Sequence, residues 1–109
     1  MTVLYGISTC DTCRKARKAL ENSGLEVAFR DVRAEPLSVD EIGRFFAEFG
    51  GKLLNTRSTT WRGLSEAERD GAPEALLAAH PTLMKRPVIE GPGGVTLGWD
   101  KAVQAAHLG

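Results

Sequence analysis

The sequence predicts an α/β fold whose sheet has a parallel half and an antiparallel half. Residues 3–7 and 27–32 are short apolar segments typical of strands, and a helical pattern over 11–23 separates them. Residues 87–89 and 95–97 read as two further strands around a glycine-rich turn. A strand–helix–strand unit implies a parallel pair with a right-handed crossover, whereas a hairpin is antiparallel.

Length and charge limit the classes of protein and partner. The chain has 109 residues, which predicts a single domain over 1–109. Fourteen basic residues balance fourteen acidic ones, so no global field attracts nucleic acid, and we expect no nucleic-acid partner. No apolar run approaches membrane-spanning length, and the N-terminus lacks the pattern of a secretory signal. We therefore expect a cytoplasmic protein without a membrane partner.

The middle of the chain predicts a helical segment. Ser38 and Glu41 have the spacing of a capping box, and an apolar stripe with helical spacing follows them. Ser65 and Glu68 repeat that spacing. The stretch 55–63 is polar and aromatic without a clear period, which predicts a loop or a frayed helix. Further helix boundaries are marked by Pro73, Pro81 and Asp100.

Cys10 and Cys13 form a C-x-x-C motif at the predicted junction of a strand and a helix. A cysteine at a helix N-terminus faces unpaired backbone N–H groups and the positive end of the helix dipole. Both favour the thiolate, which is the reactive form. Cys13 lies on the same helix face one turn later, where it can attack a mixed disulfide formed on Cys10. Cys10 is therefore the candidate nucleophile.

Two other interpretations of the cysteine pair are a zinc site and a pair of inert buried thiols. A closed zinc site needs four ligands, and the remaining soft ligands, His80 and His107, lack the usual local spacing. We therefore predict no metal. The inert interpretation suits Cys13 better than Cys10, because a side chain at the strand–helix junction is expected to be accessible.

Arg57 and Arg86 are candidate anion-binding residues. A guanidinium binds carboxylates and oxyanions through two parallel hydrogen bonds and keeps its charge. Arg57 lies in the polar stretch 55–63, and Arg86 directly precedes Pro87 at a predicted strand start. The alternative for each arginine is a solvated surface residue. Pro87 is either an ordinary turn proline or a cis proline, and periodicity does not distinguish them.

Three segments of the chain together resemble the arsenate reductase-like family, a branch of the thioredoxin superfamily, and most closely its YffB-type subgroup. The segments are residues 5–12, 53–62 and 85–89, and the resemblance extends in order over essentially the whole chain. It implies a thioredoxin-like fold with a mixed four-stranded sheet and an inserted helical segment. It also implies that Cys10 is the nucleophile, that Arg57 and Arg86 bind an oxyanion and stabilise the thiolate, and that Pro87 is a cis proline beside the active site.

The resemblance also implies partners and further site residues. Thr12 and Asn55 lie in the matched motifs and complete the predicted substrate-binding set with Arg57, Arg86 and Pro87. The YffB-type proteins imply glutathione as co-substrate, no bound cofactor, and a small oxyanion or disulfide as substrate. Glutaredoxin is a further candidate partner.

The sequence departs from the family pattern in two places. Arsenate reductases carry a third arginine after the last strand, where residues 97–100 read LGWD, so arsenate would lose one donor. Cys13 is absent from many single-cysteine members, and its presence opens an intramolecular disulfide route. Cys13 and the stretch 36–38 also resemble the Spx-like transcription regulators, which bind RNA polymerase and use the cysteine pair as a redox switch. The leading prediction is a thiol-dependent reductase; the alternatives are such a regulator and an inert thioredoxin-like fold.

Overall fold

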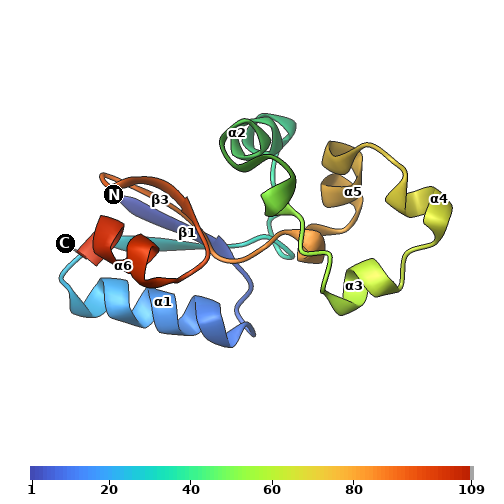
Figure 1. The fold of residues 1–109 in the computed structure, drawn as a ribbon. Helices are drawn as coiled ribbons and strands as arrows, with labels where there is room; N and C mark the ends of the chain where they lie inside the picture. Colours follow the sequence, from blue (N-terminus) through green and yellow to red (C-terminus); the bar gives the residue numbers. More distant parts are fainter. Residues whose placement is uncertain (109) are drawn as a thin grey trace. The chain divides into compact units, whose positions relative to one another are not determined.

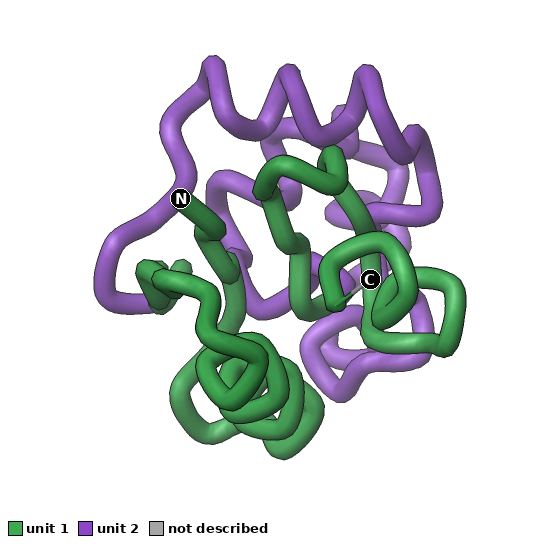
Figure 2. The backbone as a smooth tube through the Cα atoms, turned by 90° about the vertical axis from the view of Figure 1, so that its left-hand side faces the viewer, with its two compact units in different colours: residues 1–32, 86–109 green, residues 33–85 purple. Residues whose placement is uncertain are grey.

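The structure is a computed structural model that describes residues 1–108. It divides the chain into two compact units (Figure 2). The first unit combines residues 1–32 with the C-terminal segment from residue 86 and contains the whole sheet. The second unit, residues 33–85, is helical. That one domain spans 1–109 stays a prediction.

The sheet of the first unit has four strands in the order β2-β1-β3-β4. The central pair, β1 and β3, is labelled in Figure 1. The β1–β2 pair is parallel, and the β1–β3 and β3–β4 pairs are antiparallel, which confirms the predicted mixed sheet. The strands are β1 (Thr2–Gly6), β2 (Val27–Asp31), β3 (Val88–Gly91) and β4 (Gly94–Leu97).

Two helices, α1 (Asp11–Asn22) and α6 (Lys101–Leu108), pack on one face of this sheet (Figure 1). Leu4 and Ile89 are opposite each other in the β1–β3 ladder, so their side chains lie on the same face. Both belong to one buried cluster with residues of α1 and α6, and each such aliphatic side chain contributes about 1.5–3 kcal/mol by leaving water. The helix members of the cluster are Cys13, Ala16, Leu20 and Val103.

The β3–β4 hairpin is held against the C-terminal helix. The predicted hairpin is present, but its strands extend to Gly91 and Gly94, which pair with each other and leave a two-residue turn. A side chain at Gly93 would overlap the backbone carbonyl of Ala106, so glycine is needed there. His107 is partly buried, and its Nε2 lies 2.7 Å from Thr96 Oγ1. These contacts fix the end of α6 on the hairpin.

Both predicted capping boxes are present in the second unit, each at the start of a helix. Ser38 Oγ accepts from the Glu41 N–H at 3.1 Å, and the Glu41 carboxylate accepts from the Ser38 N–H at 2.9 Å. Ser65 and Glu68 repeat this arrangement. The stretch predicted as a loop or frayed helix contains one helical turn. The helices are α2 (Val39–Phe49), α3 (Thr59–Arg62), α4 (Glu66–Arg69) and α5 (Pro73–Ala79), with 3₁₀ turns at Gly50–Leu53 and Pro81–Leu83.

Two segments of the second unit, around Leu54 and Met84, are joined by a short antiparallel backbone pairing. Leu54 and Met84 form an isolated antiparallel bridge. On either side of it, the Lys85 N–H donates to the Leu53 carbonyl at 2.7 Å, and the Asn55 N–H donates to the Leu83 carbonyl at 2.8 Å. Leu53, Leu83 and Met84 are completely buried. The backbone around residues 53–55 is therefore firmly placed.

Among residues 1–108, no helix combines the length and apolar character needed to cross a lipid bilayer.

Candidate functional site

Cys10 lies at the N-cap of α1, directly after the loop that leaves β1. Its backbone is extended, with φ −81° and ψ 121°, and its side chain is partly exposed. The thiol makes no N-cap hydrogen bond of standard geometry, but the N–H of Cys13 lies close enough to favour negative charge on the sulfur. A reagent in solvent can therefore reach a sulfur that faces the start of a helix.

Opposing effects act on the pKa of the Cys10 thiol, and the net direction is downward. Partial burial raises this pKa, because it disfavours the charged form. The backbone N–H of Cys13, the Cys13 thiol and the guanidinium of Arg86 together lower it further than burial raises it. Cys10 is consequently more thiolate at neutral pH than an ordinary cysteine, which makes it the better nucleophile.

Cys13 has the opposite character. Its side chain is completely buried in the core of the first unit. Burial raises the pKa of its thiol to about 12, and the neighbouring Cys10 sulfur raises it too, against a smaller lowering by the backbone of Ile7 and by Arg86. The two cysteines are thus an accessible sulfur that ionises readily and a buried sulfur that stays protonated. Neither is in a disulfide.

The loop between β1 and Cys10 is held by three hydrogen bonds. The Cys10 N–H donates to the Ile7 carbonyl at 3.0 Å. The Ser8 N–H donates to the Asp31 carboxylate at 3.1 Å, and Arg14 Nε donates to the Ser8 carbonyl at 2.9 Å. These bonds join the ends of β1 and β2 to the first turn of α1, so they position the Cys10 backbone.

Arg86 and Pro87 directly precede β3, in the same unit as the cysteines. The Arg86–Pro87 peptide bond is cis, one of the two forms that the sequence left open. The Pro87 carbonyl accepts a hydrogen bond from the Gly98 N–H at 2.8 Å. The guanidinium of Arg86 lies close enough to the Cys10 sulfur to lower the pKa of this thiol. Cys10, Cys13 and Arg86 therefore form one site, with Thr12 exposed in the first turn of α1.

Arg57 and Asn55, the other predicted site residues, belong to the second unit. Asn55 Oδ1 accepts from the Arg57 N–H at 3.1 Å, and the Asn55 carbonyl accepts from the Ser58 N–H at 3.2 Å. This turn leaves the Arg57 side chain exposed. Both residues line a cavity of about 550 Å³. The roles assigned to them from the sequence stay predictions.

One residue of the cysteine site, Gly6, is given no role by any of the sequence motifs. Gly6, the last residue of β1, lies against Cys13: a Cβ at this position would be 2.5 Å from the Cys13 Sγ. Real Cβ atoms do not approach a sulfur so closely, because the atoms would overlap. Its place within the predicted strand 3–7 could have indicated a close approach, since glycine within a strand often marks one.

We expect Gly6→Ala to destabilise the protein by about 1–3 kcal/mol, because the added methyl group overpacks the strand against Cys13. Urea unfolding measures this change in the free energy of unfolding. Gly43→Ala is a matched control, because a Cβ there meets nothing within 4 Å, and replacing glycine within a helix stabilises by up to about 1 kcal/mol. Equal stability of Gly6→Ala and the unmodified protein would contradict the close packing.

Among residues 1–108, no three His, Cys, Asp or Glu side chains are grouped so that they could hold a metal ion. The cysteine site combines a thiolate, a neighbouring guanidinium and a second, buried thiol.

Comparison with known proteins places this arrangement in a family. The model of the ArsC family matches residues 5–106. The chain belongs to the ArsC family. Within it, the solved structure of the protein YFFB (PA3664) matches over the full length of both chains, with 37% identity and a TM-score of 0.89. This agreement confirms the predicted thioredoxin-like α/β fold.

Two further relatives show the range of the ArsC family around this chain. An arsenate reductase (ArsC) related protein from Brucella melitensis is 35% identical, with 95% of this chain and 92% of the other covered and a TM-score of 0.72. The global transcriptional regulator Spx of Listeria innocua is 34% identical over 96 residues, which cover 82% of this chain and 72% of that protein. The relatives of this chain thus include an arsenate reductase-related protein and a transcriptional regulator.

Proposed function

We propose that this protein is a thiol-dependent reductase that uses the Cys10 thiolate and takes its electrons from glutathione. The observation that carries the proposal is the pairing of an accessible sulfur, whose pKa is lowered by Cys13 and Arg86, with a buried second thiol. Membership of the ArsC family supports thiol chemistry of this kind. The substrate is a glutathione mixed disulfide or another small disulfide or oxyanion.

The first step with a mixed disulfide is attack by the Cys10 thiolate on the glutathione sulfur. A Cys10–glutathione disulfide forms, the substrate disulfide breaks, and the substrate leaves as a thiolate that takes a proton from solvent. A thiolate attacks disulfides and a thiol does not, so the rate follows the ionised fraction of Cys10. Arg86, which lowers the pKa of this thiol, sustains that fraction near neutral pH.

The second step restores Cys10. A glutathione thiolate attacks the glutathione sulfur of the adduct, which forms glutathione disulfide and releases the Cys10 thiolate. One substrate disulfide is thereby reduced to a thiol, and two glutathione units leave as the disulfide. Cys13 offers the alternative of attacking the Cys10 sulfur and forming an internal disulfide. Since burial is the largest cause of the raised pKa of Cys13, we expect external glutathione to resolve the adduct faster.

The predicted binding residues complete the proposal. Arg57 and Arg86 bind the anionic group of the substrate, because a guanidinium forms paired hydrogen bonds with carboxylates and oxyanions. Thr12, exposed in the first turn of α1, and Pro87 contact the substrate beside the sulfur. Asn55 acts through the turn in which it accepts the Arg57 N–H. We propose a disulfide rather than arsenate as the substrate, because residues 97–100 supply no third arginine.

The pH dependence of alkylation at each cysteine tests the thiol chemistry. We expect Cys10 to reach its maximal rate with iodoacetamide at a lower pH than a free cysteine, because the plateau begins once pH exceeds the thiol pKa. Cys13 should stay unreactive through the neutral range, since its pKa is about 12 and its side chain is buried. Mass spectrometry of the reduced, full-length protein reads both sites. Free-thiol behaviour of Cys10, or faster modification of Cys13, would favour the inert fold.

A redox-sensing regulator is the second candidate function, and the match to Spx of Listeria innocua favours it. In that case, Cys10 and Cys13 would form an internal disulfide on oxidation and change the affinity for RNA polymerase. Retention of the reduced and the oxidised protein on immobilised RNA polymerase distinguishes the two functions. Binding that depends on the oxidation state supports the regulator, whereas no retention in either state removes it.

A further inference from the structure

The side of α1 that faces away from the sheet is basic. The buried residues of this helix are at positions 13, 16 and 20, and residues three and four apart lie on one face of a helix. The opposite side, which we call the outer face of α1, consists of the exposed residues Asp11, Arg14, Lys15, Lys18 and Asn22. Three of these five residues are positively charged and one is negatively charged, whereas basic and acidic residues are equal in number in the whole chain.

Two lysines of the outer face have no partner among residues 1–108. The ammonium groups of Lys15 and Lys18 form neither a hydrogen bond nor an ion pair within that described part of the chain. Arg14 differs from them, because its Nε donates to the Ser8 carbonyl at 2.9 Å and its Nη1 lies 3.7 Å from the Asp11 carboxylate. The negative charge of the outer face is therefore already paired, and the charges of the two lysines are available to a partner.

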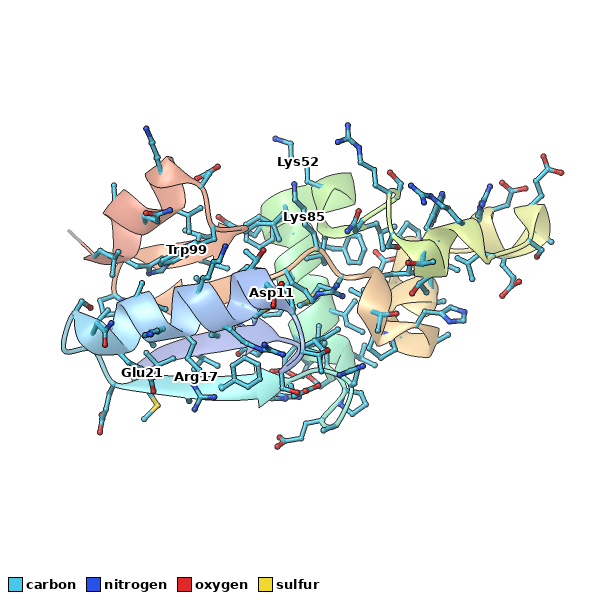
Figure 3. All side chains as sticks on the ribbon, turned by 90° about the horizontal axis from the view of Figure 1, so that it is seen from below. Asp11, Arg17, Glu21, Lys52, Lys85 and Trp99 are labelled. Carbon is cyan, nitrogen blue, oxygen red and sulfur yellow. The ribbon has the colours of Figure 1, made fainter. Side chains whose placement is uncertain are left out.

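The charges along α1 are not arranged in the way that stabilises a helix. Cations stabilise a helix in its last turn, and like charges three or four residues apart destabilise it. The last turn of α1 has no basic residue, whereas Lys18 follows Arg14 by four residues and Lys15 by three. Arg17 and Glu21, which lie 3.7 Å apart, are at another edge of the helix (Figure 3). A negatively charged partner would relieve the repulsion on the outer face.

The outer face begins beside the reactive sulfur. Cys10 is the N-cap of α1, and an α-helix rises by about 1.5 Å per residue, so Lys15 and Lys18 lie about 8 Å and about 12 Å farther along its axis. A protein that covers the Cys10 sulfur with about 800 Å² of surface, the usual area for each partner, extends about 16 Å from the centre of the contact. Such a protein covers both lysines, whereas a small disulfide can bind at Cys10 without contacting them.

We infer that the outer face of α1 is a docking surface for an acidic protein, which carries the glutathione mixed disulfide that Cys10 reduces. Lys15 and Lys18 attract acidic residues beside that disulfide and thereby raise the rate of encounter. A nucleic acid would also meet the charge, but it offers Cys10 no disulfide. The inference deepens the proposed function, on which it rests, because it names the class of substrate: a glutathionylated protein rather than a free small disulfide.

The exchange at Cys10 keeps the two steps already described. The Cys10 thiolate attacks the glutathione sulfur, the disulfide to the docked protein breaks, and that protein leaves as a thiolate that takes a proton from solvent. A second glutathione thiolate then attacks the adduct, which forms glutathione disulfide and restores the Cys10 thiolate. The outer face takes no part in these steps. Its contribution is to bring the acidic protein to the sulfur.

Turnover of three glutathionylated substrates by the full-length protein tests this inference. Two are short peptides with a central cysteine, flanked by aspartates in one and by lysines in the other, and the third is the cysteine–glutathione disulfide. At an ionic strength of about 0.01 M, where charges interact over about 30 Å, kcat/KM should be at least about tenfold higher for the acidic than for the basic peptide. At about 1 M salt, which reduces that range to about 3 Å, the preference should disappear.

Single substitutions locate the effect on the outer face. At about 0.1 M ionic strength, Lys15→Gln and Lys18→Gln should each lower kcat/KM for the acidic peptide about threefold, the size of one exposed ion pair, and leave the cysteine–glutathione disulfide unaffected. Asn22→Asp is the matched control, because it changes the charge equally on the same face but about 18 Å from Cys10 along the helix; it should leave all three rates unchanged. Lys15→Glu combined with Lys18→Glu should make the basic peptide the better substrate.

Equilibrium binding separates the inference from the proposed function. The same peptides with S-methylcysteine at the centre cannot exchange disulfides, so their dissociation constants do not depend on reductase activity. A lysine-dependent preference for the acidic peptide without turnover of any substrate would keep the docking surface and remove the proposed function. Equal binding and equal kcat/KM of the two peptides, or an equal loss on all three substrates in the lysine variants, would overturn the inference. Tighter binding of a single-stranded oligonucleotide than of the acidic peptide would overturn it in favour of a nucleic-acid surface.

Discussion

Cys10→Ser is expected to lower the glutathione-dependent reduction of a mixed disulfide by about 1,000-fold or more. A serine hydroxyl is not ionised near neutral pH and does not form a disulfide, so the covalent adduct cannot form. Losses of this order or larger follow the removal of catalytic nucleophiles in general. The measurement is the steady-state formation of glutathione disulfide at saturating glutathione. Because Cys10 is partly exposed, the thermal midpoint should change little.

Cys13→Ser is the matched comparison. If external glutathione resolves the adduct, as burial of Cys13 predicts, this variant should keep at least about a third of the turnover, since the serine hydroxyl can replace the Cys13 thiol as hydrogen-bond donor to Cys10. A Cys13→Ser variant as inactive as Cys10→Ser would show that the buried thiol resolves the adduct. Full activity of Cys10→Ser would eliminate Cys10 as the nucleophile.

Arg86→Ala is expected to raise the pKa of the Cys10 thiol and to reduce the thiolate fraction near neutral pH. Arg86 acts on this thiol through a hydrogen bond and through its charge, and both favour the thiolate. The direction of the change in the pH profile follows from the raised pKa. Reactivity falls as pH drops through the pKa of the nucleophile, and without Arg86 that fall begins at a higher pH. The alkylation rate of Cys10 as a function of pH measures the change.

Two variants make this prediction specific. Arg86→Lys keeps a charge but loses the guanidinium geometry, so its pH profile should lie between those of Arg86→Ala and the unmodified protein. Arg17→Ala removes a positive charge farther along α1, where Arg17 lies 3.7 Å from Glu21 (Figure 3), and its profile should match that of the unmodified protein. A profile for Arg86→Ala identical to that of Arg17→Ala would contradict the role of Arg86.

Local signals explain why much of the fold could be predicted from the sequence. Ser38 and Ser65 begin helices because their hydroxyls accept from the N–H three residues on, and such a contact involves only neighbouring residues. The order of strand, helix and strand similarly requires a parallel pair. The helical turn at Thr59–Arg62 was harder to predict, because it is too short for a period to show and depends on the Ser58 cap.

The site could be predicted only in part. Cys10, Cys13 and Arg86 could be predicted from the C-x-x-C motif and the Arg-Pro pair, because residue type and spacing alone identify them. The close approach of Gly6 to Cys13 depends instead on the packing distance between α1 and β1. The periodicity of the sequence does not determine that distance. Likewise, Lys52 and Lys85 line one cavity because two distant segments cross. Each lysine alone resembles an ordinary solvated side chain.

The central position of β1 in the sheet has a consequence for how the chain folds during synthesis. Its partner β2 follows after one helix, but its other partner, β3, comes from near the end of the chain: Tyr5 and Glu90, whose side chains are hydrogen-bonded, are 85 residues apart. Until β3 leaves the ribosome, one edge of β1 has no strand to pair with, and such an open apolar edge is a template for aggregation. We therefore expect closure of β1 on β3, a pairing with a long intervening loop, to limit the rate of refolding.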